Sequence, residues 1–507
     1  MAITMSGRSD AHTRGPCPCS SAGHSSPYGL RCYAFSYQED DFRRELIPQD
    51  GSAIKRTILA CAEGQISPER GPAHHEFESA AQHIMSDSAR RSHILTGALE
   101  QGLLHAEHAP LVAFLDWERV RLNVAHLMRA FPADIPVLHA FAVKANPLVP
   151  VLERLGELGM GAEVASDGEF TAAISAGIDP SRLVFDSPAK SWGELRRALG
   201  HGAALNVDNF QELARVRSIL AETGSESEIG IRLNPQVGAG AIAAMSTASA
   251  HSKFGVPLRD PGMREQLIEA YLASPWLRRA HTHVGSQGCP LPLIAEGVHE
   301  LVRFADEVNT RAGYAQIRTL DIGGGLPVDF ETDNPVSAFG DYVAALEEGA
   351  PRLFSGDYEL VTEFGRSILA KHGFIAAHVE YTKEVGGRRV AITHAGAQIA
   401  TRTVFMPDAW PLRVEGFGPG GAVKTTAQTA VHDVAGPCCF AGDLVARGRE
   451  LPLLEQGDIV ALLDTGAYYA SNPFHYNSLP VPPVYGVELD GAVAEFSTIR
   501  AADFATV

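Results

Sequence analysis

A regular alternation of short apolar runs and helical segments fills the middle of the chain, from Pro136 to Thr362. Between the runs, apolar residues recur at helical spacing, as in 192–199 and 210–221. The pattern makes eight β–α steps in about 240 residues, the size and rhythm of a (β/α)8 TIM barrel. An open, doubly wound α/β sheet is the competing architecture. The eight expected strands are Leu138–Val143, Ala162–Val164, Leu183–Phe185, Ala204–Val207, Ile229–Leu233, Ala280–Val284, Thr319–Ile322 and Tyr358–Thr362.

The chain changes in character on both sides of this repeat. Residues 376–507 hold short strand-like runs between stretches rich in Gly, Pro and Thr, which predicts an antiparallel β-domain. Residues 1–92 are rich in Ser, Gly, His and Arg without a sustained apolar period, which predicts a poorly ordered N-terminal extension. The barrel is therefore assigned to residues 93–375, although its first apolar run, 111–115, can instead join the β-domain. The strand candidates of the C-terminal part are Ala376–Tyr381, Arg389–Thr393, Asp458–Leu463 and Val484–Glu488.

The charge and cysteine content exclude several classes of protein. The chain has 42 basic and 60 acidic residues, a net charge of −18, which argues against a nucleic-acid or membrane-surface protein. The seven cysteines form neither a disulfide framework nor a paired zinc knuckle. Cys17, Cys19 and His24 could bind a metal, but they lie in a Ser- and Gly-rich stretch, so we expect no metal site.

The sequence indicates a protein of the cytoplasm. No stretch approaches 18 uninterrupted apolar residues, so no transmembrane helix is expected. Polar residues from Ser6 to Asp10 break any apolar run of a secretory signal. The stretch up to Tyr37 carries Ser and Arg with few acidic residues, so targeting to an organelle stays open.

A lysine, Lys144, ends the first apolar run of the barrel pattern. Burying an ammonium group is costly, and the C-terminal ends of barrel strands point into the active site. A desolvated lysine there is expected to have a lowered pKa and can attack an aldehyde. The alternative is a strand-end lysine that extends to water, and this is the better interpretation for Lys144 considered alone.

Three other strand ends carry residues suited to chemistry. The triplet Gly323–Gly325 lets backbone N–H groups approach a phosphate, or is only a turn. Glu363 could face a pyridine nitrogen and keep it protonated, or form an ordinary surface ion pair. His281 and His283 lie on the same side of their strand by alternation. They could bind a metal, but no third ligand stands nearby in sequence.

Taken as an ordered set, the motifs of this chain resemble those of the fold-III pyridoxal-phosphate decarboxylases, which include the ornithine, arginine and diaminopimelate decarboxylases. The resemblance runs from about Ala109 to about Val487 and is closest to the diaminopimelate decarboxylases. It implies an alanine racemase-like barrel followed by a β-domain, pyridoxal 5'-phosphate as cofactor, decarboxylation of an amino acid, and a homodimer with shared active sites. The motifs are Val143–Asn146, Ser252–Gly255, His283–Gln287, Gly323–Gly325, Glu363–Arg366, Gly436–Cys439 and Asp464–Tyr468.

The resemblance also implies a role for each matching position. Lys144 would hold the cofactor as a Schiff base, His283 would stack on its ring, and Glu363 would pair with the pyridine nitrogen. Cys439 would be the acid that reprotonates the carbanion, delivered from the second subunit. Arg402 falls where the family places an arginine for a substrate carboxylate. The phosphate would be surrounded by Ser286, Gly324, Gly325, Gly365, Arg366 and Tyr468.

Three positions depart from the family pattern. Phe364 stands where proline is usual, and His394 stands where aspartate is usual. Phe440 follows the catalytic cysteine, where the family has an acidic residue for the distal ammonium of the substrate. A phenyl ring cannot neutralise an ammonium by charge pairing, so we expect a substrate with an apolar, neutral or carboxylated tail. Arg402 would suit a carboxylated tail, whereas cation–π contact with Phe440 or another carboxylate would still admit a distal amine.

Two other functions remain open beside that of a carboxy-lyase. An amino acid racemase on the same fold would need a second base opposite Lys144 and would not need the Cys439 motif. A catalytically inactive regulatory homologue would be expected to lack Lys144 or Cys439, and both are present. Cysteines are usually small buried hydrophobic residues, but the Gly436–Pro437 and Gly442–Asp443 pairs around Cys438 and Cys439 favour a functional role here.

Overall fold

The computed structural model describes residues 86–242, 246–334, 338–425, 428–490 and 493–501, which belong to one compact unit. Most of the expected N-terminal extension, with Cys17, Cys19 and His24, lies outside the described residues. The first described helix, α3 (Asp87–Glu100), spans the expected boundary at residue 93. It begins there because the side chain of Ser86 accepts a hydrogen bond from the Ala89 N–H.

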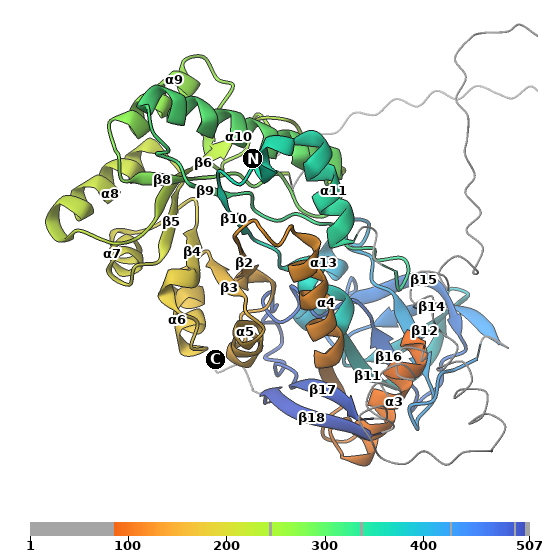
Figure 1. Cartoon of the computed structure of the whole chain (residues 1–507). Coiled ribbons are helices and arrows are strands. Elements are labelled where there is room, and N and C mark those ends of the chain that lie inside the picture. The colour runs from red at the N-terminus through yellow and green to blue at the C-terminus, as the bar shows by residue number, and fades with distance from the viewer. Residues whose placement is uncertain (1–85, 243–245, 335–337, 426–427, 491–492, 502–507) are drawn as a thin grey trace, which may run out of the picture. The chain divides into compact units, whose positions relative to one another are not determined.

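Eight parallel strands form a closed barrel (Figure 1). The order β5-β4-β3-β2-β10-β9-β8-β6 is completed by pairing of β6 with β5, so the open-sheet alternative is wrong. A short additional strand, β7 (Val256–Pro257), pairs with β6 outside the ring. The barrel strands are β2 (Val137–Ala142), β3 (Gly161–Val164), β4 (Leu183–Asp186), β5 (Ala204–Val207), β6 (Ile229–Asn234), β8 (Leu277–His281), β9 (Thr319–Asp321) and β10 (Glu359–Thr362).

Helices follow the barrel strands, and several of them start at caps that the sequence encodes. Ser166, Ser191 and Asn209 each accept a hydrogen bond from the backbone N–H of a glutamate three residues later. The helices and short 3₁₀ turns are α4 (Trp117–Ala130), η1 (Val143–Ala145), α5 (Val149–Glu157), α6 (Asp167–Ser175), η2 (Pro180–Arg182), α7 (Trp192–Gly200), α8 (Phe210–Thr223), α9 (Met263–Leu272), α10 (Leu291–Ala312), α11 (Phe339–Gly349), η4 (Pro351–Phe354), α12 (Arg366–Leu369) and η5 (Ala370–His372).

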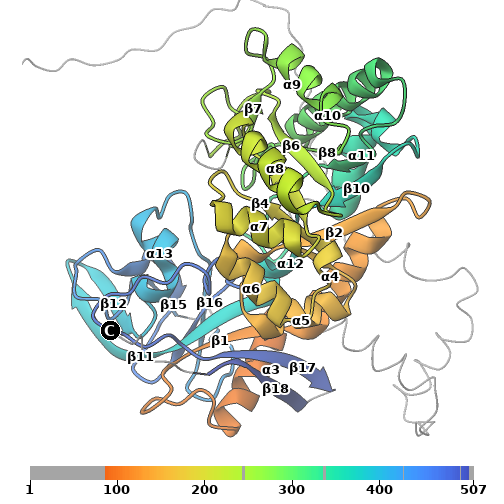
Figure 2. The same cartoon turned by 90° about the vertical axis from the view of Figure 1, so that its left-hand side faces the viewer.

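The second sheet has nine strands and builds the β-domain. The strand β1 (Leu111–Asp116) belongs to it, antiparallel to β11 and parallel to β17, as Figure 2 shows. Because β12 and β14 are also parallel, the sheet is mixed, and the expectation of a purely antiparallel domain is wrong. The remaining elements are β11 (Gly373–Val385), β12 (Arg388–Thr393), α13 (Ala397–Phe405), β13 (Val414–Phe417), β14 (Thr429–Ala435), β15 (Leu444–Pro452), β16 (Ile459–Leu462), β17 (Val484–Asp490) and β18 (Val493–Arg500).

The interior of the barrel holds both apolar and charged side chains. A small apolar cluster joins β2, β4, β5 and β10 through Ala140, Val184, Ala204 and Val361. Elsewhere in the barrel, Arg279 Nη2 lies 2.7 Å from Asp321 Oδ2, and the Asn206 side-chain amide donates to the same oxygen at 2.9 Å. These three side chains are at most 2 % exposed, so the charges are paired where water cannot reach them.

A buried histidine on β2 makes stability depend on pH. His139 is 3 % exposed, and burial lowers its pKa to about 4, below its ordinary value of 6.5. Between these values the unfolded chain binds a proton that the folded protein excludes, so stability falls as pH falls from about 6.5 to about 4. We expect about 2 kcal/mol of unfolding free energy to be lost between pH 7 and pH 5 through this residue, measured by urea unfolding.

His139→Gln should remove this part of the pH dependence. His126→Gln, at an exposed position on α4, is the matched control and should leave the wild-type pH dependence unchanged. An unchanged difference between pH 7 and pH 5 in the His139 variant would contradict the expectation.

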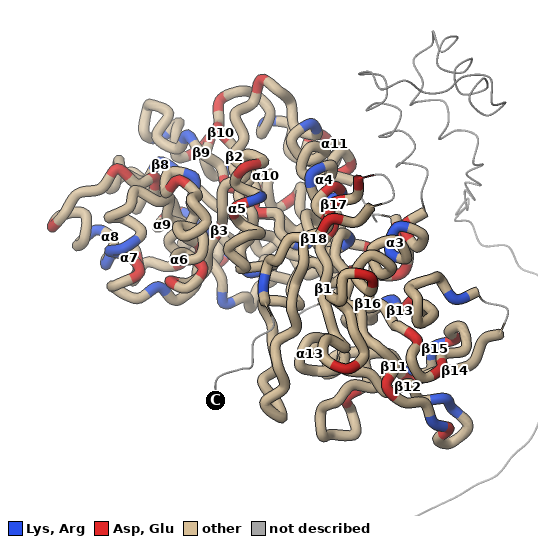
Figure 3. Tube along the Cα trace, turned by 90° about the horizontal axis from the view of Figure 1, so that it is seen from below, with Lys and Arg blue, Asp and Glu red and all other residues tan. Residues whose placement is uncertain are grey.

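Acidic and basic residues are interspersed along the chain trace, which Figure 3 shows from below. Within the residues described, no helix combines the length and the apolar character needed to cross a membrane.

Candidate active site

Lys144 lies in the turn η1, directly after β2, and its amine is paired with a buried carboxylate. Its Nζ is 2.6 Å from Glu163 Oε2 on β3, and the Glu163 side chain is 1 % exposed. The amine therefore turns into the barrel rather than extending to water, although the side chain as a whole is 40 % exposed. Burial would lower the pKa of Lys144, but the charges of Glu163 and Glu363 outweigh it and raise that pKa. The expectation of a lowered lysine pKa is therefore wrong for this arrangement.

Glu363 follows β10 and contacts both histidines of the His281–Gln287 segment. Its Oε2 lies 3.6 Å from His281 Nε2 and 3.5 Å from His283 Nδ1, so the two histidines share a side, as alternation predicts. Burial opposes ionisation of Glu363, but the two imidazoles and Lys144 hold its pKa well below the ordinary value. The other oxygen, Oε1, is buried without a hydrogen-bond partner. It can accept a hydrogen bond from a group that enters the site.

The glycine triplet fits tightly between the two neighbouring motifs. Gly323 and Gly325 have φ angles of 66° and 104°, in the region that favours glycine. A Cβ on Gly324 would clash with the carbonyl oxygen of Glu363, and one on Gly325 would clash with that of Gly285. The Gly324 N–H donates to His283 Nδ1 at 3.2 Å. The triplet therefore brings the ends of β8, β9 and β10 together, with Ser286 one residue beyond Gly285.

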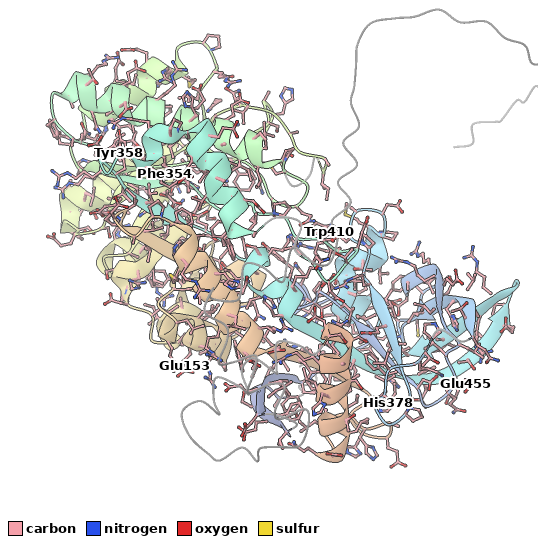
Figure 4. All side chains as sticks on the ribbon, turned by 45° about the vertical axis from the view of Figure 1, so that its right-hand side comes forward. Glu153, Phe354, Tyr358, His378, Trp410 and Glu455 are labelled. Atoms are coloured by element: carbon pink, nitrogen blue, oxygen red, sulfur yellow. The ribbon has the colours of Figure 1, made fainter. Side chains whose placement is uncertain are left out.

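The buried Arg366 and the half-buried Arg402 share two aromatic rings. Arg366 begins α12 and Arg402 lies on α13. Their guanidinium carbons lie 4.4 and 4.6 Å from the ring centre of Tyr468, and 4.7 and 5.2 Å from that of Trp410. Trp410, labelled in Figure 4, is a residue that sequence reasoning missed, since it follows α13 in a segment without a recognisable motif.

No described residue neutralises this arginine pair by an ion pair, and Arg366 Nε and Arg402 Nη1 are buried without hydrogen-bond partners. Burial lowers the pKa of Arg366, and the positive charge of Arg402 lowers it further. Guanidinium groups with free donors are suited to bind carboxylate or phosphate. The arginine pair is therefore a candidate anion-binding site.

The Asp464–Tyr468 loop joins the β-domain to the turn that carries Lys144. The Tyr468 N–H donates to the Ala145 carbonyl at 2.6 Å, and the Asn146 side chain donates to the Gly466 carbonyl at 3.2 Å. A Cβ on Gly466 would clash with the carbonyl of Leu369 in α12. Gly365 also packs here, since its Cβ would lie 2.9 Å from Ala142 Cβ. Lys144, Gly365, Arg366 and Tyr468 thus converge on one place.

Comparison with known proteins identifies the family. The family model of the pyridoxal-dependent decarboxylases, for their pyridoxal binding domain, matches residues 118–370. The diaminopimelate decarboxylase of Zymomonas mobilis is 32 % identical over 352 residues, which cover 68 % of this chain and 79 % of that protein. This chain belongs to the pyridoxal-dependent decarboxylases. Another relative, the diaminopimelate decarboxylase of Pseudomonas aeruginosa, is 34 % identical over 347 residues, covering 68 % of this chain and 80 % of its own length.

A solved structure supports the same relationship. The crystal structure of an I148L mutant of the Helicobacter pylori diaminopimelate decarboxylase, complexed with L-lysine, matches with a TM-score of 0.70 and 28 % identity. The match covers 80 % of this chain and 96 % of that one. This decarboxylase is therefore an enzyme of the carboxy-lyase class, and its cofactor is pyridoxal 5'-phosphate. The residues fit that cofactor, because the unpartnered oxygen of Glu363 and the unneutralised arginines offer partners for its ring nitrogen and its phosphate.

The two adjacent cysteines of the decarboxylase differ in environment. Cys438 is 6 % exposed, and its Sγ lies 3.7 Å from Gln398 Oε1, as for a small buried residue. Cys439 is exposed, and its N–H donates to Asn477 Oδ1 at 2.8 Å. No hydrogen bond, ion pair or ring contact joins Cys439 to Lys144 within the described part of the chain.

Phe440 belongs to a cluster of four aromatic rings beside Cys439. Its ring stacks on Phe405 at 5.6 Å and meets Phe474 and Tyr476 edge-on at 6.5 and 5.9 Å. Phe405 and Tyr476 are 52 % and 37 % exposed, so the cluster presents an apolar face. Phe405 lies on α13, three residues after Arg402, which places the cluster and the anion-binding site on one helix.

Proposed function

We propose that this decarboxylase removes the α-carboxylate of an amino acid whose tail is apolar, neutral or carboxylated, with Lys144 holding the cofactor. The observation that carries the proposal is that Lys144 and Glu363 lie at the ends of the neighbouring strands β2 and β10, where the buried Oε1 of Glu363 has no hydrogen-bond partner. Pyridoxal phosphate, when bound, draws electrons from the bond that breaks, most strongly when its ring nitrogen is protonated. The lowered pKa of Glu363 favours its ionised form, which in turn favours the protonated ring nitrogen.

The residues near Lys144 would bind the cofactor or transfer a proton. Lys144 must lose a proton from Nζ before it can act as a nucleophile, and Glu163 Oε2, 2.6 Å away, is placed to accept it. Burial and the neighbouring carboxylates raise the pKa of Glu163, which suits a proton acceptor. His283 would cover the ring of the cofactor. The residues that would hold its phosphate are Ser286, Gly324, Gly325, Gly365, Arg366 and Tyr468.

The arginine pair suits two anionic groups. One is the cofactor phosphate, bound through Arg366. The other is a carboxylate of the substrate, bound through Arg402 on the same aromatic rings. After carbon dioxide leaves, the thiol of Cys439 supplies a proton to the carbon, and this thiol comes from the second copy of a homodimer.

The aromatic cluster sets the nature of the substrate tail. Diaminopimelate would bring a distal ammonium beside Phe440. The ring of Phe440 contacts the rings of Phe405, Phe474 and Tyr476. None of these side chains can neutralise an ammonium by charge pairing, so a charged amine loses more hydration than it regains.

Phe440→Glu is expected to raise kcat/KM for meso-diaminopimelate by about 10- to 100-fold relative to the wild type. The physical reason is that the new carboxylate pairs with the distal ammonium. The measurement is carbon dioxide release from a panel of amino acids with apolar, neutral, carboxylated and cationic tails. Phe405→Glu adds the same charge to the same cluster, but not beside Cys439, and should give no such gain.

The same panel tests the alternatives. Efficient decarboxylation of meso-diaminopimelate by the wild type would overturn the assignment of the tail and leave the enzyme class intact. Cofactor binding without carbon dioxide release from any amino acid would favour an inactive regulatory homologue. Inversion of an amino acid without carbon dioxide release would favour a racemase.

A further inference from the structure

A line of alternating buried charges extends from Glu363 through the barrel. His281, on β8, is 0 % exposed. Its Nε2 lies 3.6 Å from Glu363 Oε2 and its Nδ1 lies 3.9 Å from Asp186 Oδ2, on β4. Asp186 in turn contacts Arg232, on β6, whose Nη1 is 2.5 Å from the same oxygen. The line therefore crosses four strands of the barrel, from β10 to β6.

The far end of the line is held by a motif that the site does not otherwise use. The Arg232 guanidinium covers the ring of Phe254 at 4.4 Å. The next residue, Gly255, has a φ of 70°, and its N–H donates to Asp208 Oδ1 at 2.9 Å. Arg232 is 5 % exposed, so its position and charge are fixed by these contacts.

The geometry defines the protonation state of His281. Both of its ring nitrogens face carboxylate oxygens, and neither has another hydrogen-bond partner. A neutral imidazole keeps one nitrogen as an acceptor, and an acceptor facing a buried carboxylate is repelled by it. The doubly protonated form presents a donor to each carboxylate. Burial opposes that charge, but Asp321, Glu363 and Asp186 outweigh it and raise the pKa of His281.

The other charged groups near this line are already paired. Asp321, on β9, is bound by Arg279 at 2.7 Å, and Glu163, on β3, is bound by Lys144 at 2.6 Å. His283 contacts the same Glu363 oxygen as His281. Carboxylate oxygens of Glu163, Asp186 and Glu363 lie within 4.8 Å of one another. Without the charge of His281, one of these buried carboxylates would take up a proton.

We propose that His281 is a positioning residue that stays positively charged, keeps the Glu363 carboxylate ionised, and anchors its Oε2 so that Oε1 faces a cationic ring nitrogen. The proposal deepens the proposed function, on which it rests, because it explains how Glu363 keeps its charge inside the barrel. The charge on His281 is a property of the cofactor-free protein, so it can be measured without the cofactor.

The first test reads the protonation state directly. In cofactor-free protein labelled with 15N-histidine, the His281 signals are identified by their loss in His281→Gln. We expect both ring nitrogens to remain protonated from pH 6 to pH 8, and we expect Asp186→Asn to shift the loss of the proton to lower pH. A neutral His281 at pH 7 in the wild type would overturn the proposal.

The second test reads the effect on cofactor binding. Titration of the cofactor-free protein with pyridoxal phosphate should give a dissociation constant at least about 10-fold higher for His281→Gln, because Glu363 gains a proton. The loss should grow as pH falls from 8 to 6, whereas wild-type binding should vary less over that range. His139→Gln, which alters another buried barrel histidine, should bind like the wild type.

The outcomes separate this proposal from the proposed function. Equal affinity and equal pH dependence in His281→Gln and the wild type would remove the positioning role and leave Lys144 and Glu363 in place. Failure of the wild type to bind pyridoxal phosphate would instead remove the proposed function, and the labelled histidine signals would still report the charge on His281.

Discussion

Lys144→Ala is expected to lower kcat by at least roughly 10³-fold and to abolish the visible absorption band of the lysine-bound cofactor. Alanine leaves no nitrogen to bond to the cofactor aldehyde. It also leaves Glu163 buried without its partner at 2.6 Å, so some loss of stability accompanies the loss of activity. The measurements are an absorption spectrum with added pyridoxal phosphate and single-turnover release of carbon dioxide.

Lys144→Arg is the control that separates these two effects. Arginine keeps a positive charge for Glu163, but its guanidinium stays protonated and is not a nucleophile. We expect its unfolding free energy to stay close to that of the wild type, while its activity falls as in the alanine variant. Retention of the absorption band in either variant would show that another residue holds the cofactor.

Cys439→Ala is expected to lower kcat by about 10²- to 10³-fold and to leave cofactor binding unchanged. The thiol is the exposed group proposed to return a proton to carbon, and alanine fills its space without a donor. No hydrogen bond or ion pair joins Cys439 to Lys144 within the described residues of one chain, and in the proposed site the thiol comes from a second copy.

Mixing the Lys144→Ala and Cys439→Ala proteins tests this sharing. If each site combines Lys144 of one copy with Cys439 of the other, half of the randomly formed dimers contain one intact site of two. Activity should then return to about a quarter of the wild-type value. Sites built from one copy alone would give no recovery, because every subunit in the mixture carries one defect. Gel filtration of each variant checks that dimers form.

The barrel could be predicted from sequence because its strands are buried on both faces and therefore read as continuous apolar runs. All eight expected runs, from Leu138–Val143 to Tyr358–Thr362, coincide with strands of the ring to within a few residues. In the β-domain, β14 and β15 are only partly buried, and they were missed among the Gly- and Pro-rich segments. The parallel pairing of β1 with β17 joins segments hundreds of residues apart, which no local pattern encodes.

The site was predictable where a strand end carries an unusual residue, as at Lys144 and Glu363. Glu163 was missed, although a carboxylate in the middle of the expected strand Ala162–Val164 is itself a signal of a buried charge. The pKa of Lys144 was predicted in the wrong direction because the prediction counted burial and omitted this partner. Trp410 could not be found, because its contact with Arg366 depends on the folding of distant segments.

The pairing of β1 within the second sheet makes the barrel an insertion into the β-domain. The chain enters the barrel where β1 passes directly into α4 at Trp117, and leaves it where η5 passes directly into β11 at Gly373. A domain tethered at two points, both without a linker, has less freedom to rotate than one joined through a single flexible linker. The spacing between the Lys144 turn and Tyr468 is thereby held by covalent connectivity as well as by the hydrogen bond to Ala145. We therefore expect substrate entry to depend on movement of surface loops or of the second copy, rather than on opening of the two domains.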